Sequence, residues 1–273
     1  MDKSALWLFA AECEGGGISA WKTEDGRWAN AYPEVTGYLL PTMVKWGAGD
    51  LALRSASWLL SLQNGDGSFN GIDGKPRPFD TAAIIEGLVY VHEWSGMFQF
   101  INAAERAMQW TRQQIHPYGY LTNASDNDIP EVYNLRASAI IGNNSELSYW
   151  KEHGLNRGEQ RTHYLAYALE GALNINEDDT WARQQIIMAY NMQSGLMPFY
   201  VRHDWSSNHP SFDYCASAQM GILYQRIGLD AGRVYRLLTG ALEPNGGLCQ
   251  SNDDKRQIAW AVKFYLDLKK VMQ

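Results

Sequence analysis

The pattern of hydrophobic and polar positions divides the chain into two alternating kinds of helical segment. Residues 79–94, FDTAAIIEGLVYVHEW, are apolar on nearly every face, as expected for a helix that is packed on both sides. Residues 49–62 differ, because apolar residues recur there in steps of three and four while Asp50 and Arg54 fall on the other side. The first kind predicts an inner helix, and the second predicts an outer helix with one face in water.

Both kinds of segment recur along the whole sequence. Inner helices are predicted near residues 33–46, 79–94, 131–142, 161–173, 212–227 and 254–270. Outer helices are predicted near residues 3–13, 49–62, 101–115, 144–152, 178–192 and 229–241. Because such helices bury their second face only against a neighbouring pair, the pairs must stack, and a closed ring removes the exposed ends. We therefore predict one all-α domain over residues 1–273, an (α/α)6 toroid, with an open helical solenoid or irregular bundle as the alternative.

The connections between these helices carry a repeated glycine signal. A glycine is followed at once, or one residue later, by an apolar residue at Gly17-Ile18, Gly67-Ser68-Phe69, Gly119-Tyr120-Leu121, Gly154-Leu155, Gly195-Leu196-Met197 and Gly247-Leu248. Gly67 and Gly247 are expected to supply positive φ in their turns. Strand-like alternation is brief even at its best, from Leu196 to Val201, so β structure is predicted only within loops.

One of these turns supports a resemblance. Trp58-Leu59 followed by Gln63-Asn64-Gly65-Asp66-Gly67-Ser68-Phe69 resembles the QW repeat of the squalene-hopene cyclase and prenyltransferase superfamily, with Phe69 where tryptophan is usual. Two other turns, at residues 193–197 and 243–248, keep only parts of the repeat. The resemblance implies a toroidal fold and by itself implies no activity.

The catalytic motifs of that superfamily are incomplete in this sequence. Asn176-Glu177-Asp178-Asp179-Thr180 is similar to the Asp-x-Asp-Asp-Thr segment of terpene cyclases, but Asn176 replaces the first acid, so we expect Asp178 or Asp179 to cap or begin an outer helix. Asp213-Tyr214-Cys215 is similar to part of the prenyltransferase zinc site, but no histidine follows residue 209. We predict neither a metal nor another cofactor.

A second resemblance is to the α/α toroids of carbohydrate-active enzymes, which include glucuronyl hydrolases, polysaccharide lyases and sugar epimerases. The segment Tyr32-Pro33-Glu34-Val35-Thr36-Gly37-Tyr38 is similar to a stretch in uncharacterised bacterial proteins of polysaccharide gene clusters. This resemblance implies an oligosaccharide or polysaccharide substrate.

Charge and composition exclude other classes of partner. The net charge of −7 and the absence of Lys or Arg runs argue against nucleic acid, and no apolar run is long enough to insert in a membrane. The first residues are predicted to form a helix and not an export signal. The cysteines Cys13, Cys215 and Cys249 are odd in number and far apart, which favours a reducing cytoplasm over a disulfide framework. The oligomeric state stays open.

The candidate chemistry lies where the inner helices begin. If these helices run parallel, their first turns meet at one mouth, together with the acids Glu34, Asp80, Glu131, Asp213 and Asp254. We predict that Glu34 and Asp213 face each other as acid and base, with Asp80 in support. The predicted substrate-binding residues are Tyr38, Trp21, Trp28, Glu131, Arg161, His163, His203, Trp205 and His209. The alternative for each acid is helix capping alone.

Three classes of function fit this pattern. A carboxylate pair suits a glycoside hydrolase, whereas a Tyr, His or Arg set suits proton abstraction next to a uronate carboxylate, as in a lyase or epimerase. A carbohydrate-active enzyme of one of these types is the favoured prediction. The alternatives are a terpene cyclase or prenyltransferase-like protein, for which the polar mouth is unfavourable, and a non-catalytic glycan-binding module.

Overall fold

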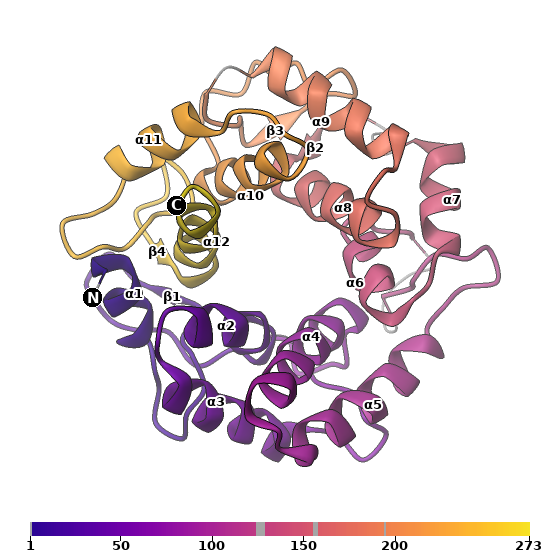
Figure 1. Cartoon of the computed structure of the whole chain (residues 1–273), viewed down its shortest axis with the longest axis vertical. Coiled ribbons are helices and arrows are strands. Elements are labelled where there is room, and N and C mark those ends of the chain that lie inside the picture. Colours follow the sequence, from indigo (N-terminus) through magenta and orange to yellow (C-terminus); the bar gives the residue numbers. More distant parts are fainter. Residues whose placement is uncertain (1, 124–128, 155–157, 194) are drawn as a thin grey trace.

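The chain forms a ring of paired helices (Figure 1). The computed structural model describes residues 2–123, 129–154, 158–193 and 195–273. Within these residues, six inner and six outer helices alternate along the sequence and around the ring. The predicted all-α toroid is therefore confirmed.

The inner helices form the inner wall of the toroid. They are α2 (Pro33–Lys45), α4 (Pro78–Ser95), α6 (Asn134–Ile141), α8 (Thr162–Ile175), α10 (Tyr214–Arg226) and α12 (Ala259–Val271). Each packs against the next, and α12 packs against α2, so the contacts close on themselves. The predicted segments match these helices closely except that α6 and α12 begin later than expected, because residues 131–133 and 254–258 form turns and a short strand.

The outer helices cover the wall from outside. They are α1 (Lys3–Phe9), α3 (Gly49–Leu62), α5 (Phe98–Arg112), α7 (Ser145–His153), α9 (Thr180–Met192) and α11 (Gly232–Gly240). The Asn176–Thr180 segment precedes α9 as expected, since the Asp179 side chain accepts a hydrogen bond of 2.9 Å from the Ala182 amide and caps the helix. In the part of the chain that the structure describes, every helix is too short or too polar to span a bilayer.

Two short antiparallel ribbons lie in the loops, as the sequence predicts. β1 (Trp21–Lys22) pairs with β4 (Gln257–Ile258), in the register Trp21 to Ile258. β2 (Gln160–Arg161) pairs with β3 (Tyr200–Val201), in the register Arg161 to Tyr200. The first ribbon joins the beginning of the chain to its end, and an ion pair of 2.5 Å between Lys269 and Asp2 does the same, so these contacts close the ring.

Glycines have two roles in this fold: they permit close contact between helices, and they supply positive φ in turns. A Cβ on Gly87 of α4 would lie 2.0 Å from the carbonyl oxygen of Gly37 on α2, so these inner helices are in backbone contact. Gly67 has the predicted positive φ, +96°. The same prediction is wrong for Gly247, because the left-handed residue of that turn is its neighbour Gly246, at φ +93° against the Lys3 backbone.

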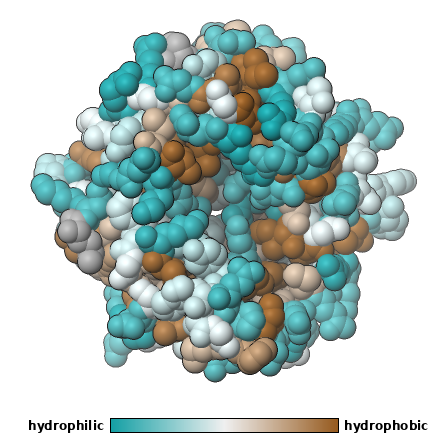
Figure 2. All heavy atoms as spheres, viewed as in Figure 1, coloured by the Kyte–Doolittle hydropathy of each residue, from teal (hydrophilic) through white to brown (hydrophobic). Residues whose placement is uncertain are grey.

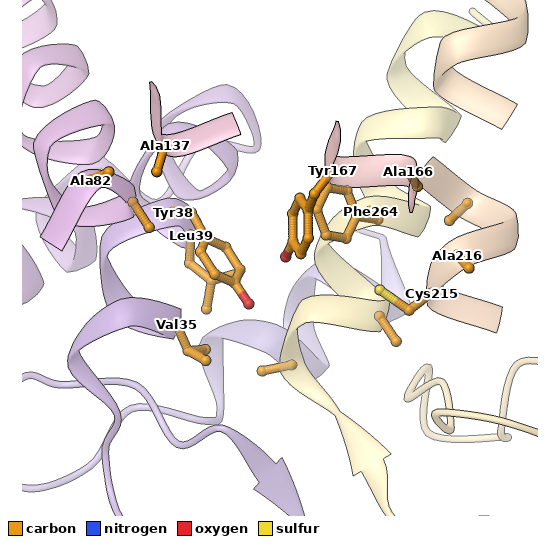
Figure 3. Close-up of a cluster of buried hydrophobic side chains, with 14 of the residues drawn as sticks. Val35, Tyr38, Leu39, Ala82, Ala137, Ala166, Tyr167, Cys215, Ala216 and Phe264 are labelled. Atoms are coloured by element: carbon orange, nitrogen blue, oxygen red, sulfur yellow. The ribbon is translucent and has the colours of Figure 1, made fainter. Parts of the chain in front are cut away.

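The centre of the ring contains both charged and aromatic side chains. Arg136 is buried and forms ion pairs with Glu86 and Glu170. Next to it, Tyr38 from α2 and Tyr167 from α8 point toward one another, with Phe264 of α12 beside them (Figure 3). A narrow opening is visible near the centre of the face shown in Figure 2.

Candidate functional site

A cavity of about 220 Å³ lies where the inner helices begin. It is lined by Tyr32, Glu34, Tyr38, Phe79, Asp80, Tyr133, Arg161, His163, Tyr164, Tyr167 and Trp260. Glu34, Asp80, His163 and Trp260 lie in the first turns of α2, α4, α8 and α12. The first turns of four of the six inner helices therefore meet at one mouth, as expected for helices that run parallel.

Proline places the two acids at the rim. Pro33 and Pro78 are the first residues of α2 and α4, where the missing amide hydrogen costs nothing. The residue before each proline is extended, Tyr32 at φ −123° and Arg77 at φ −127°. Glu34 and Asp80 follow in the first turn, so the same local device brings one carboxyl from each of two neighbouring inner helices to the cavity.

Asp80 is held by a residue of the adjacent helix. Its Oδ2 accepts a hydrogen bond of 2.7 Å from the Tyr32 hydroxyl. Burial raises the pKa of Asp80 to about 6, although the Tyr32 hydrogen bond and the charge of Arg77 lower it. Asp80 can thus exchange a proton near neutral pH.

Glu34 is the second carboxyl of the pair, and it too holds its proton more tightly than an ordinary glutamate. Burial and the nearby charge of Asp80 raise the pKa of Glu34 well above its ordinary value. A hydrogen bond with Tyr32 and the charge of Arg136 oppose this rise only in part. Burial and mutual repulsion therefore favour a state in which the pair of carboxyls carries one proton, which is the state needed for a general acid and a general base.

His163 is neutral in this environment. Burial and the charge of Arg161 lower the pKa of His163 to about 3. Its Nδ1 donates a hydrogen bond of 2.5 Å to Oε1 of Gln219, which leaves Nε2 as an acceptor. Such an imidazole is a weak base but a good acceptor for a hydroxyl group.

Arg161 is positioned by the ribbon of β2 and β3. Its guanidinium carbon lies 4.7 Å from the centre of the Phe199 ring and 5.4 Å from that of Tyr164. Nε lies 3.8 Å from Oδ2 of Asp213. Stacking and the charge of Asp213 hold this cation at the cavity wall, where it suits an anionic or hydroxyl-rich ligand.

Asp213 does not face Glu34 across the bowl, in contrast to the predicted arrangement. Its side chain is fully buried and caps α10, accepting a hydrogen bond of 2.9 Å from the Ala216 amide. Burial raises the pKa of Asp213 to about 6. The cap turns the carboxyl into the protein and behind Arg161, so Asp80 takes the place next to Glu34 that the sequence assigned to Asp213.

The other predicted substrate-binding residues separate into two groups. Tyr38, Arg161 and His163 line the cavity. Six others do not line it. Glu131, whose pKa burial raises, precedes α6; Trp28 contacts Trp7 at a tilt of 55°, with ring centres 4.9 Å apart; and Arg256 lies over Trp21. His203 and the fully buried Trp205 line a separate cavity, and His209 is exposed beside Tyr200.

The sequence-based prediction omitted several aromatic residues of the cavity: Tyr32, Phe79, Tyr133, Tyr164, Tyr167 and Trp260. A signal for most of them exists, because they lie in or beside the first turn of an inner helix, as the acids do. Among the described residues, no three His, Cys, Asp or Glu side chains come together as a metal site.

The fold is shared with solved structures of low sequence identity. A novel alpha-amylase from Clostridium perfringens superposes with a TM-score of 0.76 at 10% identity, covering 100% of this chain and 98% of that one. PssZ from Listeria monocytogenes gives 0.72 at 10%, covering 97% and 93%. An unsaturated glucuronyl hydrolase specific for heparin gives 0.70 at 13%, covering 98% and 94%. No protein-family model and no curated protein matches the chain.

Proposed function

We propose that this protein is a carbohydrate-active hydrolase that cleaves a glycosidic bond in the cavity at the mouth of the toroid. One observation carries the proposal: Glu34 and Asp80 enter one cavity from adjacent inner helices, and the Tyr32 hydroxyl donates a hydrogen bond of 2.7 Å to Asp80 there. The likeness of the fold to structures named as an alpha-amylase and a glucuronyl hydrolase supports it.

In this proposal the two carboxyls have opposite roles. Glu34 donates its proton to the glycosidic oxygen as the bond from that oxygen to the anomeric carbon breaks. Asp80 accepts a proton from water, whose oxygen bonds to the anomeric carbon. The products are a free hemiacetal and an alcohol, and exchange with solvent returns the proton from Asp80 to Glu34. Tyr32 keeps Asp80 ionised and in place.

The remaining cavity residues suit a sugar. Aromatic rings such as Tyr133 and Trp260 offer apolar faces for a pyranose ring, while Arg161 and Nε2 of His163 offer polar contacts. An isoprenoid hydrocarbon would offer no polar contact to the two carboxyls and Arg161, which it would cover and desolvate. A lyase or epimerase needs a base strong enough to remove a proton from carbon, and the depressed pKa of His163 disfavours it in that role.

The test is an assay of the purified protein against a panel of neutral and uronate-containing oligosaccharides, with products separated by chromatography. Hydrolysis adds one water to the substrate, whereas a lyase yields an unsaturated uronate that absorbs in the ultraviolet. Glu34→Gln and Asp80→Asn should each lower turnover by about 10² to 10⁴-fold, the usual contribution of an acid or base.

A matched control separates chemistry from folding. Asp50 is an exposed acid in the first turn of the outer helix α3 and does not line the cavity, so Asp50→Asn should retain turnover. Circular dichroism should show native helix content in all three variants. Full turnover in Glu34→Gln, or no change in any saccharide of the panel, would contradict the proposal.

A further inference from the structure

A second cavity, of about 270 Å³, opens beside the candidate site. The two cavities share the side chains of Tyr32, Phe79, Asp80 and Tyr133. Asp80 and its hydrogen-bond partner Tyr32 therefore lie at the boundary between the two cavities, and each cavity is open to them.

The first cavity is too small for a chain of sugars. Its volume of about 220 Å³ is below the roughly 300 to 1,000 Å³ typical of sites for drug-sized ligands. Below the acids it is lined by Tyr38 and Tyr167, which point toward one another from opposite helices (Figure 3). This volume suits a single sugar unit, so any longer substrate has to continue elsewhere.

The second cavity has the chemistry for a neighbouring sugar. Arg77 forms an ion pair of 2.5 Å with Asp73 and donates a hydrogen bond of 3.3 Å to the carbonyl oxygen of Asn123. These groups offer donors and acceptors for hydroxyls. Ile72 lies on the same wall and is 68% exposed, so its side chain offers an apolar contact for a sugar face.

The absence of a side chain at Gly71 leaves space at the boundary between the two cavities. A Cβ at this position would lie 2.8 Å from Oδ2 of Asp80 and 2.9 Å from Cγ of Arg77. Both neighbours are fixed, Asp80 by Tyr32 and Arg77 by Asp73, so an added methyl group would narrow the passage between the cavities.

We propose that the second cavity binds the sugar unit on the far side of the cleaved bond, so that the substrate is a chain of at least two sugars from which the terminal unit, held in the first cavity, is removed. This inference rests on the proposed function. It adds Ile72, Asp73 and Arg77 as residues that select the leaving part of the substrate.

The experiment measures binding, by calorimetry, to the Glu34→Gln variant of the full chain. The probes are glucose and maltose for a neutral substrate, and glucuronic acid and a glucuronate-terminated disaccharide for an acidic one. The disaccharide of the preferred pair should bind more tightly than its monosaccharide. Adding Ile72→Trp, which fills the second cavity, should weaken disaccharide binding by about tenfold and leave monosaccharide binding nearly unchanged.

Lys75→Trp is the matched control, because Lys75 is an exposed residue of the same loop that does not line the second cavity. Gly71→Ala is a second variant that should also lower the preference for the disaccharide. Equal affinity for monosaccharide and disaccharide, equal effects of Ile72→Trp and Lys75→Trp, or no binding of any probe would overturn the inference. Failure of the proposed function can be distinguished from failure of this inference. If the wild-type protein binds disaccharides through Ile72 but hydrolyses none of them, only the proposed hydrolase activity is contradicted.

Discussion

Tyr32 and Asp80 are 48 residues apart and lie at the starts of different inner helices, yet the Tyr32 hydroxyl donates a hydrogen bond of 2.7 Å to Oδ2 of Asp80. Tyr32 is the residue before α2, and Asp80 lies in the first turn of α4. Because a donor to an ionised carboxylate stabilises the charged form, this contact opposes the rise in pKa that burial causes. The bond thus sets both the place and the charge of the proposed base.

Replacing Tyr32 with Phe should raise the pKa of Asp80 above about 6, since burial would then act without the hydrogen bond. The rate on an identified substrate should rise with pH as Asp80 ionises, and in Tyr32→Phe this rise should move to higher pH. The pH profile of kcat/KM checks it. Tyr118→Phe, at a ring that is 77% exposed, is the control. An unmoved profile would show that Tyr32 does not tune the base.

The wild-type profile should be bell-shaped. The rate rises through the pKa of Asp80, about 6, and falls at higher pH when Glu34 loses its proton, because the pKa of Glu34 is raised well above its ordinary value. Both limits belong to the coupled pair of carboxyls and not to either alone. A rate that increases steadily into the alkaline range would exclude Glu34 as the general acid.

Asp213 should make folding stability depend on pH. Its folded pKa of about 6 lies above the ordinary 3.8, so the native state holds the proton more tightly, and its contribution to the unfolding free energy falls as pH rises from about 4 to about 6. Asp213→Asn keeps a side-chain oxygen for the α10 cap and has no such titration. Its stability relative to wild type should therefore increase over that range by on the order of 1 to 3 kcal/mol.

Urea unfolding at several pH values measures this difference. Asp213→Ala is the comparison, because it also loses the hydrogen bond to the Ala216 amide and should be less stable than Asp213→Asn by about 1 kcal/mol at every pH. If the difference between Asp213→Asn and wild type does not change with pH, the buried carboxyl does not titrate in this range.

Arg161 should distinguish acidic from neutral ligands. Arg161→Ala removes the cation at the cavity wall, and Arg161→Lys keeps a charge but loses the planar stack on Phe199 and Tyr164. We expect affinity for glucuronic acid to fall by about tenfold or more in Arg161→Ala, with a smaller fall for glucose and an intermediate effect in Arg161→Lys. Calorimetry with both sugars provides the measurement. Equal losses for the two sugars would mean that Arg161 recognises no anion.

The contact between Gly37 and Gly87 should be intolerant of any side chain. Gly87→Ala places a Cβ 2.0 Å from a backbone oxygen and forces α2 and α4 apart, at a cost of about 2 kcal/mol or more. In Gly240→Ala the new methyl meets nothing within 4 Å, so this helical position should be neutral or gain about 0.5 kcal/mol. Unfolding midpoints of the two variants in urea test the contrast, and similar midpoints would contradict it.

The sequence by itself determined the number, order and kind of helices in the toroid. Apolar periodicity, prolines at helix starts and glycines in turns act within a few residues, so segments such as 79–94 and 49–62 could be assigned without knowing their neighbours. The same local signals placed Glu34 and Asp80 in first turns. They failed between Gly246 and Gly247, where the backbone of a distant segment, at Lys3, selects the left-handed residue.

Only the tertiary structure decided which of the acids share a cavity. Glu34, Asp80 and Asp213 all begin inner helices, and their local sequences do not distinguish a cavity carboxyl from a buried cap. The difference depends on the rotation of each helix about its axis and on contacts across the ring. Those contacts join Tyr32 to Asp80 and place Asp213 behind Arg161. Such side-chain orientations follow from packing between helices that are distant in sequence, which is why local patterns could predict the mouth but not its carboxyl pair.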